Sequence, residues 1–279
     1  MSTPTDDARP LVVESSDIPE RAAPVLETTG LSVHYGGVAA NRDVSISVRP
    51  GEVVGLIGPN GAGKTSFVDA VTGFASYSGS VRLAGEVIDG LPSYARRRAG
   101  LARTWQAGEL FDQLTVAENL ELVVEPGGIG AVLRDVLGRR SSRRRVTEQV
   151  RDVLEMTELT DVADRVPSEL SLGLQKLVGV ARAVASDAKV LLLDEPAAGL
   201  SSSESQEFGR SLQKFVDRGI GILMIDHDMD LIMNYTHRLF VLNFGSIIAE
   251  GDPAQIRDDP AVISAYLGAT ESEEQRHHG

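Results

Sequence analysis

The sequence predicts an α/β protein built on a parallel, helix-covered sheet, with an antiparallel β subdomain and a helical subdomain attached. After residue 170, predicted helices and strands alternate, which is typical of such a sheet. These elements span residues 171–186, 189–194, 204–216, 220–226 and 239–243. Earlier, an apolar strand over Glu52–Gly58 ends in glycine and leads into a helix over Thr65–Gly73. Both stretches favour the same layered core.

The remaining segments supply the two subdomains. Short β-rich runs predict antiparallel strands at Val25–Tyr35, Val44–Val48 and, as a pair, around Gly79–Val87. Strand signals are few between about Gly108 and Pro167. Helices are expected there instead, over residues 115–122, 129–137 and 147–159, the last with apolar side chains at helical spacing. This middle stretch therefore predicts a helical insert.

We expect one domain over residues 25–268, with the helical subdomain at about 108–168. Residues 1–24 hold four prolines, many charges and little hydrophobic pattern, so a disordered tail is predicted there. A second polar tail is predicted over 269–279. The N-terminus does not have the pattern of a secretory signal, and no apolar run approaches the roughly 20 residues that span a bilayer.

Composition narrows the function classes. The 279 residues are 42% hydrophobic and 24% charged, and the chain has no cysteine, which excludes disulfides and thiolate metal sites. The net charge of -13 disfavours nonspecific binding of nucleic acid, and we expect no nucleic-acid partner. Two basic clusters, Arg96–Arg98 and Arg139–Arg145, run against this charge. The second is interpreted either as a solvated helix junction or as a contact for anionic headgroups or an acidic partner.

The residues from Gly58 to Thr65 match a phosphate-binding loop, in which glycines flank a four-residue spacer and Lys-Thr follows. Such glycines let backbone N–H groups turn toward phosphate oxygens, and the next helix adds its positive end. Lys64 is the only lysine in the first 175 residues, which argues against chance. The predicted nucleotide-binding residues here are Gly58, Pro59, Asn60, Gly61, Ala62, Gly63, Lys64, Thr65 and Ser66. Lys64 would meet the β and γ phosphates, and Thr65 would meet Mg²⁺.

Two carboxylates follow the apolar strand that ends at Asp194. Ligands of open α/β sheets sit at this end of the strands. Asp194 is suited to hold Mg²⁺ through water, and Glu195 to polarise an attacking water. The alternative is a capping pair, since Asp-Glu-Pro also begins turns. The phosphate loop upstream favours the functional interpretation.

Three further candidates are weaker when taken singly. Ser171 and Gly173 lie at the start of a predicted helix, where exposed N–H groups and a hydroxyl can bind an anion, or where Ser171 is an ordinary N-cap. His227 follows an apolar strand, and Gln106 borders the helical insert. A lone histidine or a surface amide at such a position is more often structural.

The order of these motifs along the chain resembles that of the ATP-binding cassette (ABC) ATPases. The resemblance covers about Val25 to Gly268 and implies a P-loop NTPase cassette with a RecA-like core. It implies that Tyr35 stacks on adenine, that Gln106 touches Mg²⁺ and senses the transporter, and that Glu195 is the catalytic base, with His227 as the switch histidine. It also implies that Ser171 and Gly173 reach ATP held by a second cassette. Leu174 and Ser201 depart from the common pattern, so this sharing is the least secure part of the resemblance.

A narrower resemblance is to the ATPase subunits of branched-chain amino acid importers. It is carried by Arg103-Thr104-Trp105-Gln106, by Asp226-His227-Asp228-Met229 and by the end of the chain through Ala265-Tyr266-Leu267-Gly268. It implies ATP and Mg²⁺ as cofactors, two membrane permease subunits, a second ATPase subunit and an extracytoplasmic solute-binding protein as partners, and a peripheral place on the cytoplasmic face of the membrane. Importers of urea or short amides, or a non-transport ABC ATPase, are the alternatives.

Overall fold

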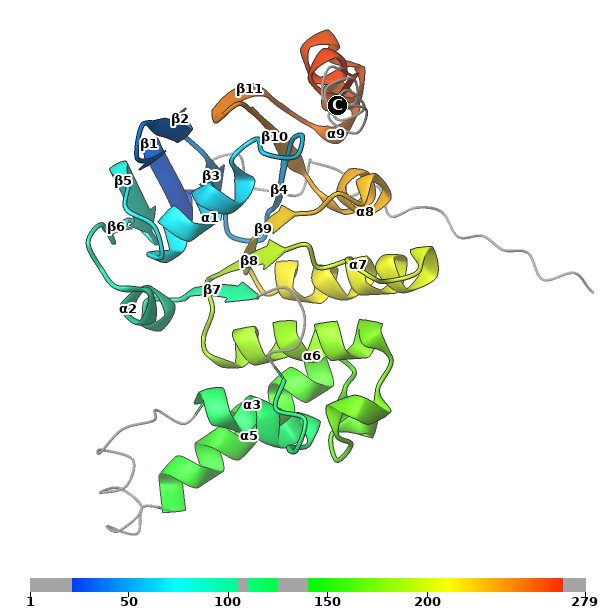
Figure 1. Cartoon of the computed structure of the whole chain (residues 1–279). Coiled ribbons are helices and arrows are strands. Elements are labelled where there is room, and N and C mark those ends of the chain that lie inside the picture. The colour runs from blue at the N-terminus through cyan, green and yellow to red at the C-terminus, as the bar shows by residue number, and fades with distance from the viewer. Residues whose placement is uncertain (1–21, 105–109, 125–139, 268–279) are drawn as a thin grey trace, which may run out of the picture.

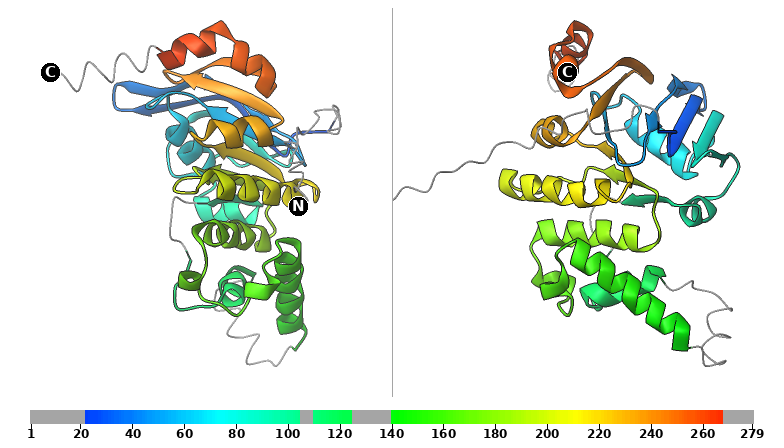
Figure 2. Two further views of the ribbon diagram at one scale, coloured as in Figure 1. Left: turned by 90° about the vertical axis from the view of Figure 1, so that its right-hand side faces the viewer. Right: turned by 180° about the vertical axis from the view of Figure 1, so that it is seen from behind.

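The computed structural model describes residues 22–104, 110–124 and 140–267, and all statements below concern these residues. Two sheets form one part of the molecule, with helix α1 (Lys64–Thr72) lying between them (Figure 1). Helices α3 (Val116–Val124) and α5 (Arg140–Met156) lie at the opposite end, beyond α6 (Leu172–Ala185). The views from the side and from behind show the same succession (Figure 2).

The larger sheet has six strands in the order β11-β10-β4-β9-β8-β7. Neighbouring strands are parallel throughout, except that the edge strand β11 runs antiparallel to β10. The strands are β4 (Val53–Ile57), β7 (Leu101–Thr104), β8 (Val190–Asp194), β9 (Gly221–Ile225), β10 (Arg238–Asn243) and β11 (Ser246–Gly251). The predicted parallel core is therefore confirmed.

Both faces of this sheet are buried at its central strands, which explains why β4, β8 and β9 are largely continuous apolar runs. In β8, Leu191 and Leu193 pack in a core on the side of α6 and α7 (Ser202–Val216). Val190 and Leu192 point the other way, into a core shared with α1 and the smaller sheet. The period of two along the strand thus divides one apolar run between two cores.

The smaller sheet is antiparallel, as predicted, with the order β2-β1-β5-β6 and β3 paired to β1. Its strands are β1 (Leu26–Tyr35), β2 (Val38–Val44), β3 (Ser47–Val48), β5 (Ser78–Leu83) and β6 (Glu86–Val87). The strand predicted over 44–48 was wrong in its bounds. A tight turn at Gly36 and Gly37 pairs Tyr35 with Val38, so β2 starts earlier than predicted. Two residues outside any strand then separate β2 from β3.

The predicted helices at 65–73, 115–122, 147–159, 171–186 and 204–216 are confirmed within a few residues, α5 beginning earlier than predicted, while the one predicted over 129–137 lies outside the described residues. Several short elements were not predicted. They are α2 (Ser93–Arg98), β7, α8 (Met229–Tyr235), β11 and α9 (Pro253–Asp258), followed by a helical segment over 260–267. Strand β7 is only four residues long, and its pairing with β8 defines it rather than a local pattern. The described residues between 110 and 170 contain helices and no strand.

One of the two basic clusters is divided by the fold. Arg96 is buried, and its guanidinium donates hydrogen bonds to the carbonyls of Ala70 and Val71 at the end of α1. It is therefore a helix C-terminal cap rather than part of a surface patch. Within the described ranges, no helix has both the length and the apolar character needed to cross a membrane.

Candidate functional site

The parallel strands deliver the predicted site residues to one edge of the sheet. Strand β4 ends at the phosphate loop, β8 ends at Asp194, and β9 ends just before Asp226 and His227. Because these strands are parallel neighbours, their carboxyl ends meet at the same edge. Strand β7 joins them there with Arg103 and Thr104. Gln106 lies outside the described residues.

The phosphate loop has the backbone that its glycines allow. Gly58 and Gly63 have φ values of 148° and 107°, and Gly63 is the N-cap of α1. A Cβ on Gly58 would lie 2.0 Å from the carbonyl oxygen of Leu242, and one on Gly63 would lie 2.3 Å from that of Ala40. Gly61, by contrast, faces open space. The loop is thus clamped at both ends by backbone, with an open middle that fits a phosphate chain.

Neighbouring strands hold this loop at points that sequence patterns did not reveal. Asn41 on β2 is fully buried, and its amide donates to the carbonyl of Gly63 at 3.1 Å. The N–H of Gly245, in the turn after β10, donates to the carbonyl of Ala62 at 2.9 Å. Both contacts cross large distances in sequence, so only tertiary structure reveals them.

Tyr266 reaches the same loop from the end of the chain. Burial raises the pKa of its hydroxyl, and the backbone N–H of Gly58 donates to that hydroxyl, which acts in the opposite sense. In the sequence, the terminal stretch Ala265-Tyr266-Leu267-Gly268 indicates only a family resemblance. The structure gives it a physical meaning, since Tyr266 connects the last helical segment to the first glycine of the loop.

Lys64 folds back onto its own loop. Its ammonium donates to the carbonyls of Gly58 at 2.6 Å and Pro59 at 3.1 Å. Burial lowers the pKa of Lys64, and the nearby carboxylates of Glu195 and Asp194 partly offset this. The structure therefore places the lysine near both carboxylates.

Asp194 is 8% exposed and lies in an ion pair. Its Oδ2 accepts a hydrogen bond from Arg103 at 2.8 Å, and the same guanidinium donates to Asp69 of α1 at 2.6 Å. The exposed hydroxyl of Thr65 stands at the start of that helix. Hydroxyl and carboxylate oxygens are the donors that Mg²⁺ prefers, so the residues present fit this cation.

Glu195 occupies an uncommon backbone conformation. Its φ is +49°, in the left-handed region that disfavours non-glycine residues, and its N–H donates to the carbonyl of Ile225 at 2.7 Å. Strand β8 ends one residue earlier, at Asp194. Such strain at the end of a strand is frequent at functional sites.

His227 is placed by the preceding aspartate. One carboxylate oxygen of buried Asp226 accepts from the N–H groups of His227 and Asp228, and the other accepts from the N–H of Ala197 at 2.8 Å. The carboxylate thus ties the His227 loop to the loop that follows Glu195. The His227 side chain is 75% exposed and its ring projects to solvent. In the sequence Asp226 is part of a family resemblance only, and its role in holding the two loops was not predicted because both bonds to it depend on the fold.

The other predicted residues lie elsewhere. Ser171 is the N-cap of α6 and accepts from the N–H of Leu174. Ser171 and Gly173 line a pocket of about 410 Å³ that contains no residue of the phosphate loop. Tyr35 is 54% exposed at the end of β1. Within this one chain, the structure does not bring Ser171 and Gly173 to the loop.

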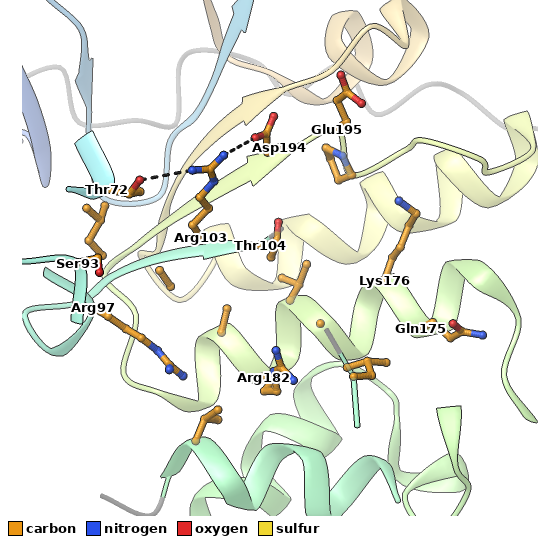
Figure 3. A pocket seen from close by; sticks show the side chains of 18 of the residues that line it. Thr72, Ser93, Arg97, Arg103, Thr104, Gln175, Lys176, Arg182, Asp194 and Glu195 are labelled. Carbon is orange, nitrogen blue, oxygen red and sulfur yellow. Dashed lines mark hydrogen bonds and ion pairs between the residues drawn. The ribbon is translucent and has the colours of Figure 1, made fainter. Parts of the chain in front are cut away.

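A larger pocket of about 950 Å³ lies between the sheet edge and α6 (Figure 3). Asp194, Glu195, Arg103 and Gln175 all line it, and so does Lys176, which was not singled out in the sequence. Burial lowers the pKa of Lys176, while Asp226 and Glu195 act in the opposite sense. The half-buried ammonium therefore lies near both carboxylates, although it belongs to the α6 helix.

Comparison with known proteins agrees with this geometry. The ABC transporter family model matches residues 41–198, and a model described as branched-chain amino acid ATP-binding cassette transporter matches residues 246–272. The chain is 39% identical over 251 residues to the high-affinity branched-chain amino acid transport ATP-binding protein BraF of Pseudomonas aeruginosa, covering 88% of this chain and 98% of that protein. The protein LivG of Escherichia coli is 38% identical over the same coverage.

Solved structures show the same fold. A nucleotide-free ATP-binding cassette from an ABC transporter superposes with a TM-score of 0.75 at 30% identity, covering 88% of this chain and 99% of that one. The ADP conformation of an ATP-binding cassette of an ABC transporter gives a TM-score of 0.75 at 29% identity, covering 88% and 100%. With its phosphate loop, its Asp194-Glu195 strand end and these relatives, the chain belongs to the ABC transporter family, as an ATP-binding cassette ATPase.

Proposed function

We propose that this chain is the ATP-hydrolysing subunit of an importer for branched-chain amino acids. One observation carries the proposal: Lys64, Asp194, Glu195 and His227 are delivered to a single sheet edge beside an open phosphate loop. The match of residues 246–272 to a branched-chain amino acid transporter model supports the solute class. The relatives named BraF and LivG support it as well.

In this proposal the loop residues bind the phosphates of ATP and Tyr35 stacks on its adenine. Thr65, Gln106 and Asp194 hold Mg²⁺, which neutralises charge on the phosphates when bound. Glu195 orients the attacking water, and His227 holds the γ-phosphate. Ser171 and Gly173 face the nucleotide of a second cassette, which agrees with their distance from the loop of their own chain. Two cassettes would then enclose two ATP molecules.

We infer that the chain acts on the cytoplasmic face of a membrane beneath two permease subunits. The large pocket supports this assignment, because Tyr94, Phe111 and Leu122 are 64%, 54% and 50% exposed around it. Apolar side chains gathered at a groove mark a protein-binding surface. A permease segment seated there would lie between the helical insert and the carboxylates.

Uptake of labelled solute tests the proposal. A strain lacking this chain is expected to lose high-affinity leucine uptake and to regain it with the wild-type chain, but not with Glu195→Gln. Labelled urea and acetamide serve as matched solutes, and their loss in place of leucine would favour the alternative importers. Capture of the chain from membranes should also yield two permease subunits and a second cassette. An ATPase that is active but recovers no membrane subunit would contradict the transport role.

A further inference from the structure

The contacts of Arg103 reach beyond the residues assigned above. Its side chain is 7% exposed, and its two terminal nitrogens bind carboxylates on two different elements. One is Asp69 of α1 at 2.6 Å, and the other is Asp194 at the end of β8, at 2.8 Å. Figure 3 shows the guanidinium between Asp194 and the end of α1, where Thr72 lies.

These two elements carry the two described residues proposed to bind Mg²⁺. Asp69 lies four residues after Thr65, one turn further along the same face of α1. Asp194 is itself the second candidate ligand. Because an arginine fork binds two carboxylates in a fixed geometry, Arg103 sets the position of α1 against β8 and so of Thr65 against Asp194.

The ion pair also orients the Asp194 carboxylate. Arg103 holds Oδ2, and no hydrogen bond from a described residue reaches Oδ1. A carboxylate that is held by one oxygen presents the other in a defined direction. In the proposed site Asp194 would hold Mg²⁺ through water, so the direction of its second oxygen would set where that water is bound.

The charge of Arg103 acts in the opposite sense, since a cation beside Asp194 repels Mg²⁺. The two effects predict opposite results when the arginine is removed. Partners that orient a metal ligand typically account for about 10- to 100-fold in metal affinity. The side chain is buried and both of its terminal nitrogens bind carboxylates. When it is removed, the loss of a fixed Asp194 orientation is expected to outweigh the relief of charge repulsion.

We propose that Arg103 is a positioning residue for the cation that accompanies the nucleotide, acting through Asp194 and through Asp69 on the helix of Thr65. The inference rests on the proposed nucleotide site. Arg103 stands three residues before Gln106, so the same fork also anchors the strand from which that residue follows.

The measurement is the affinity of a fluorescent, non-hydrolysable ATP analogue, taken in saturating Mg²⁺ and again in EDTA. The affinity in Mg²⁺ divided by the affinity in EDTA isolates the contribution of the cation. In Arg103→Gln we expect this ratio to fall by about tenfold or more, with the EDTA affinity little changed. Arg103→Lys keeps the charge but cannot bridge both carboxylates. Its affinity ratio should lie between that of the wild type and that of Arg103→Gln. Binding of Mn²⁺ to the nucleotide-loaded chain, measured by its EPR signal, should weaken from the wild type to Arg103→Lys to Arg103→Gln.

Arg96→Gln is the matched control, because Arg96 is also a buried arginine that binds the carbonyls at the end of α1, and no ion pair joins it to a carboxylate among the described residues. It should lower the melting temperature without changing the ratio. Asp69→Asn removes one arm only and is expected to lower the ratio less than Arg103→Gln; it carries the test if Arg103→Gln does not fold. A wild-type ratio in both variants, or tighter Mg²⁺ binding in Arg103→Gln, would overturn the inference. A wild-type chain with no dependence on Mg²⁺ would instead overturn the proposed site itself.

Discussion

The start of α1 and the start of α6 use the same physical device in two different ways. Each is a helix N-terminus, which can bind an anion; α1 follows its glycine-rich loop, whereas the motif of α6 begins at the N-cap Ser171 and has its glycine, Gly173, inside the helix. The loop before α1 is clamped by Ala40, Asn41 and Leu242, and it lies beside carboxylates of the same chain. At the start of α6, Ser171 and Leu172 are exposed, and Ser171 caps the helix. The first region meets Asp194 and Glu195 of its own chain, while the second lines a separate pocket together with side chains of α7 such as Glu204.

The structure gives local roles to both residues that depart from the family pattern, Ser201 and Leu174. Ser201 is the N-cap of α7 and forms a capping box with Glu204. A serine satisfies that role as well as an aspartate does, so local helix stability is preserved. Leu174 packs in part against the apolar core on the α6 side. Both departures lie on the side of the molecule where the site would be shared, and the loop is unaffected.

The largest effect is expected for Glu195→Gln. If Glu195 is the base that polarises water, its removal should reduce ATP hydrolysis by about 10²- to 10⁴-fold while ATP still binds. Dimers should accumulate with ATP and Mg²⁺ in a sizing experiment. Glu155→Gln, an exposed carboxylate of α5, is the control and should hydrolyse ATP normally. A variant that remains active, or stays monomeric with ATP, would remove Glu195 from this role.

The second largest effect is expected for Lys64→Ala, in the phosphate loop before α1. Loss of a charged hydrogen-bonding partner for the phosphates should weaken ATP binding by about 10- to 100-fold, since such bonds contribute about 1.5–3 kcal/mol. Equilibrium titration of the isolated chain measures it. Lys214→Ala, which removes a lysine paired with Glu158 far from the loop, should bind ATP as the wild type does. Unchanged affinity in Lys64→Ala would refute the loop assignment.

Ser171→Ala tests the incomplete end. The isolated chain should bind ATP with wild-type affinity, whereas hydrolysis by the assembled cassettes should fall by several-fold as a shared contact is lost. Removing the N-cap also costs about 1 kcal/mol of helix stability. Ser186→Ala, at the other end of the same helix, removes a side-chain hydrogen bond to the carbonyl of Ala183 without touching the motif. Equal hydrolysis in the two variants would leave Ser171 as a cap alone.

The smallest effect is expected for Tyr266→Phe. It removes one neutral hydrogen bond to Gly58, so ATP affinity should fall by about two- to tenfold, corresponding to about 0.5–1.5 kcal/mol. Tyr235→Phe removes a similar bond to the carbonyl of Gln206, away from the loop, and should not change ATP affinity. If both variants bind ATP like the wild type, the last helical segment does not support the loop.

Much of the site could be predicted because its signals are local. A phosphate loop needs glycines at fixed positions before a helix, and an apolar strand that ends in two carboxylates is legible in a few residues. The long helices and buried strands were predicted for the same reason. Strand β7 was missed because its four residues carry little local pattern and are defined by their pairing with β8. The bounds of β2 were missed although Gly36-Gly37 is itself a local hairpin signal.

The sequence by itself determined which chemical groups are present and in what order, since the loop, Asp194-Glu195, Ser171 and His227 can each be read from neighbouring residues. Only the tertiary structure decided which of them meet. Parallel pairing brings the ends of β4, β8 and β9 to one edge, and it leaves Ser171 in a different pocket. It also joins Arg103 to Asp194, which lie 91 positions apart along the chain. Contacts across such a separation depend on the register of strands, and no local pattern encodes that register.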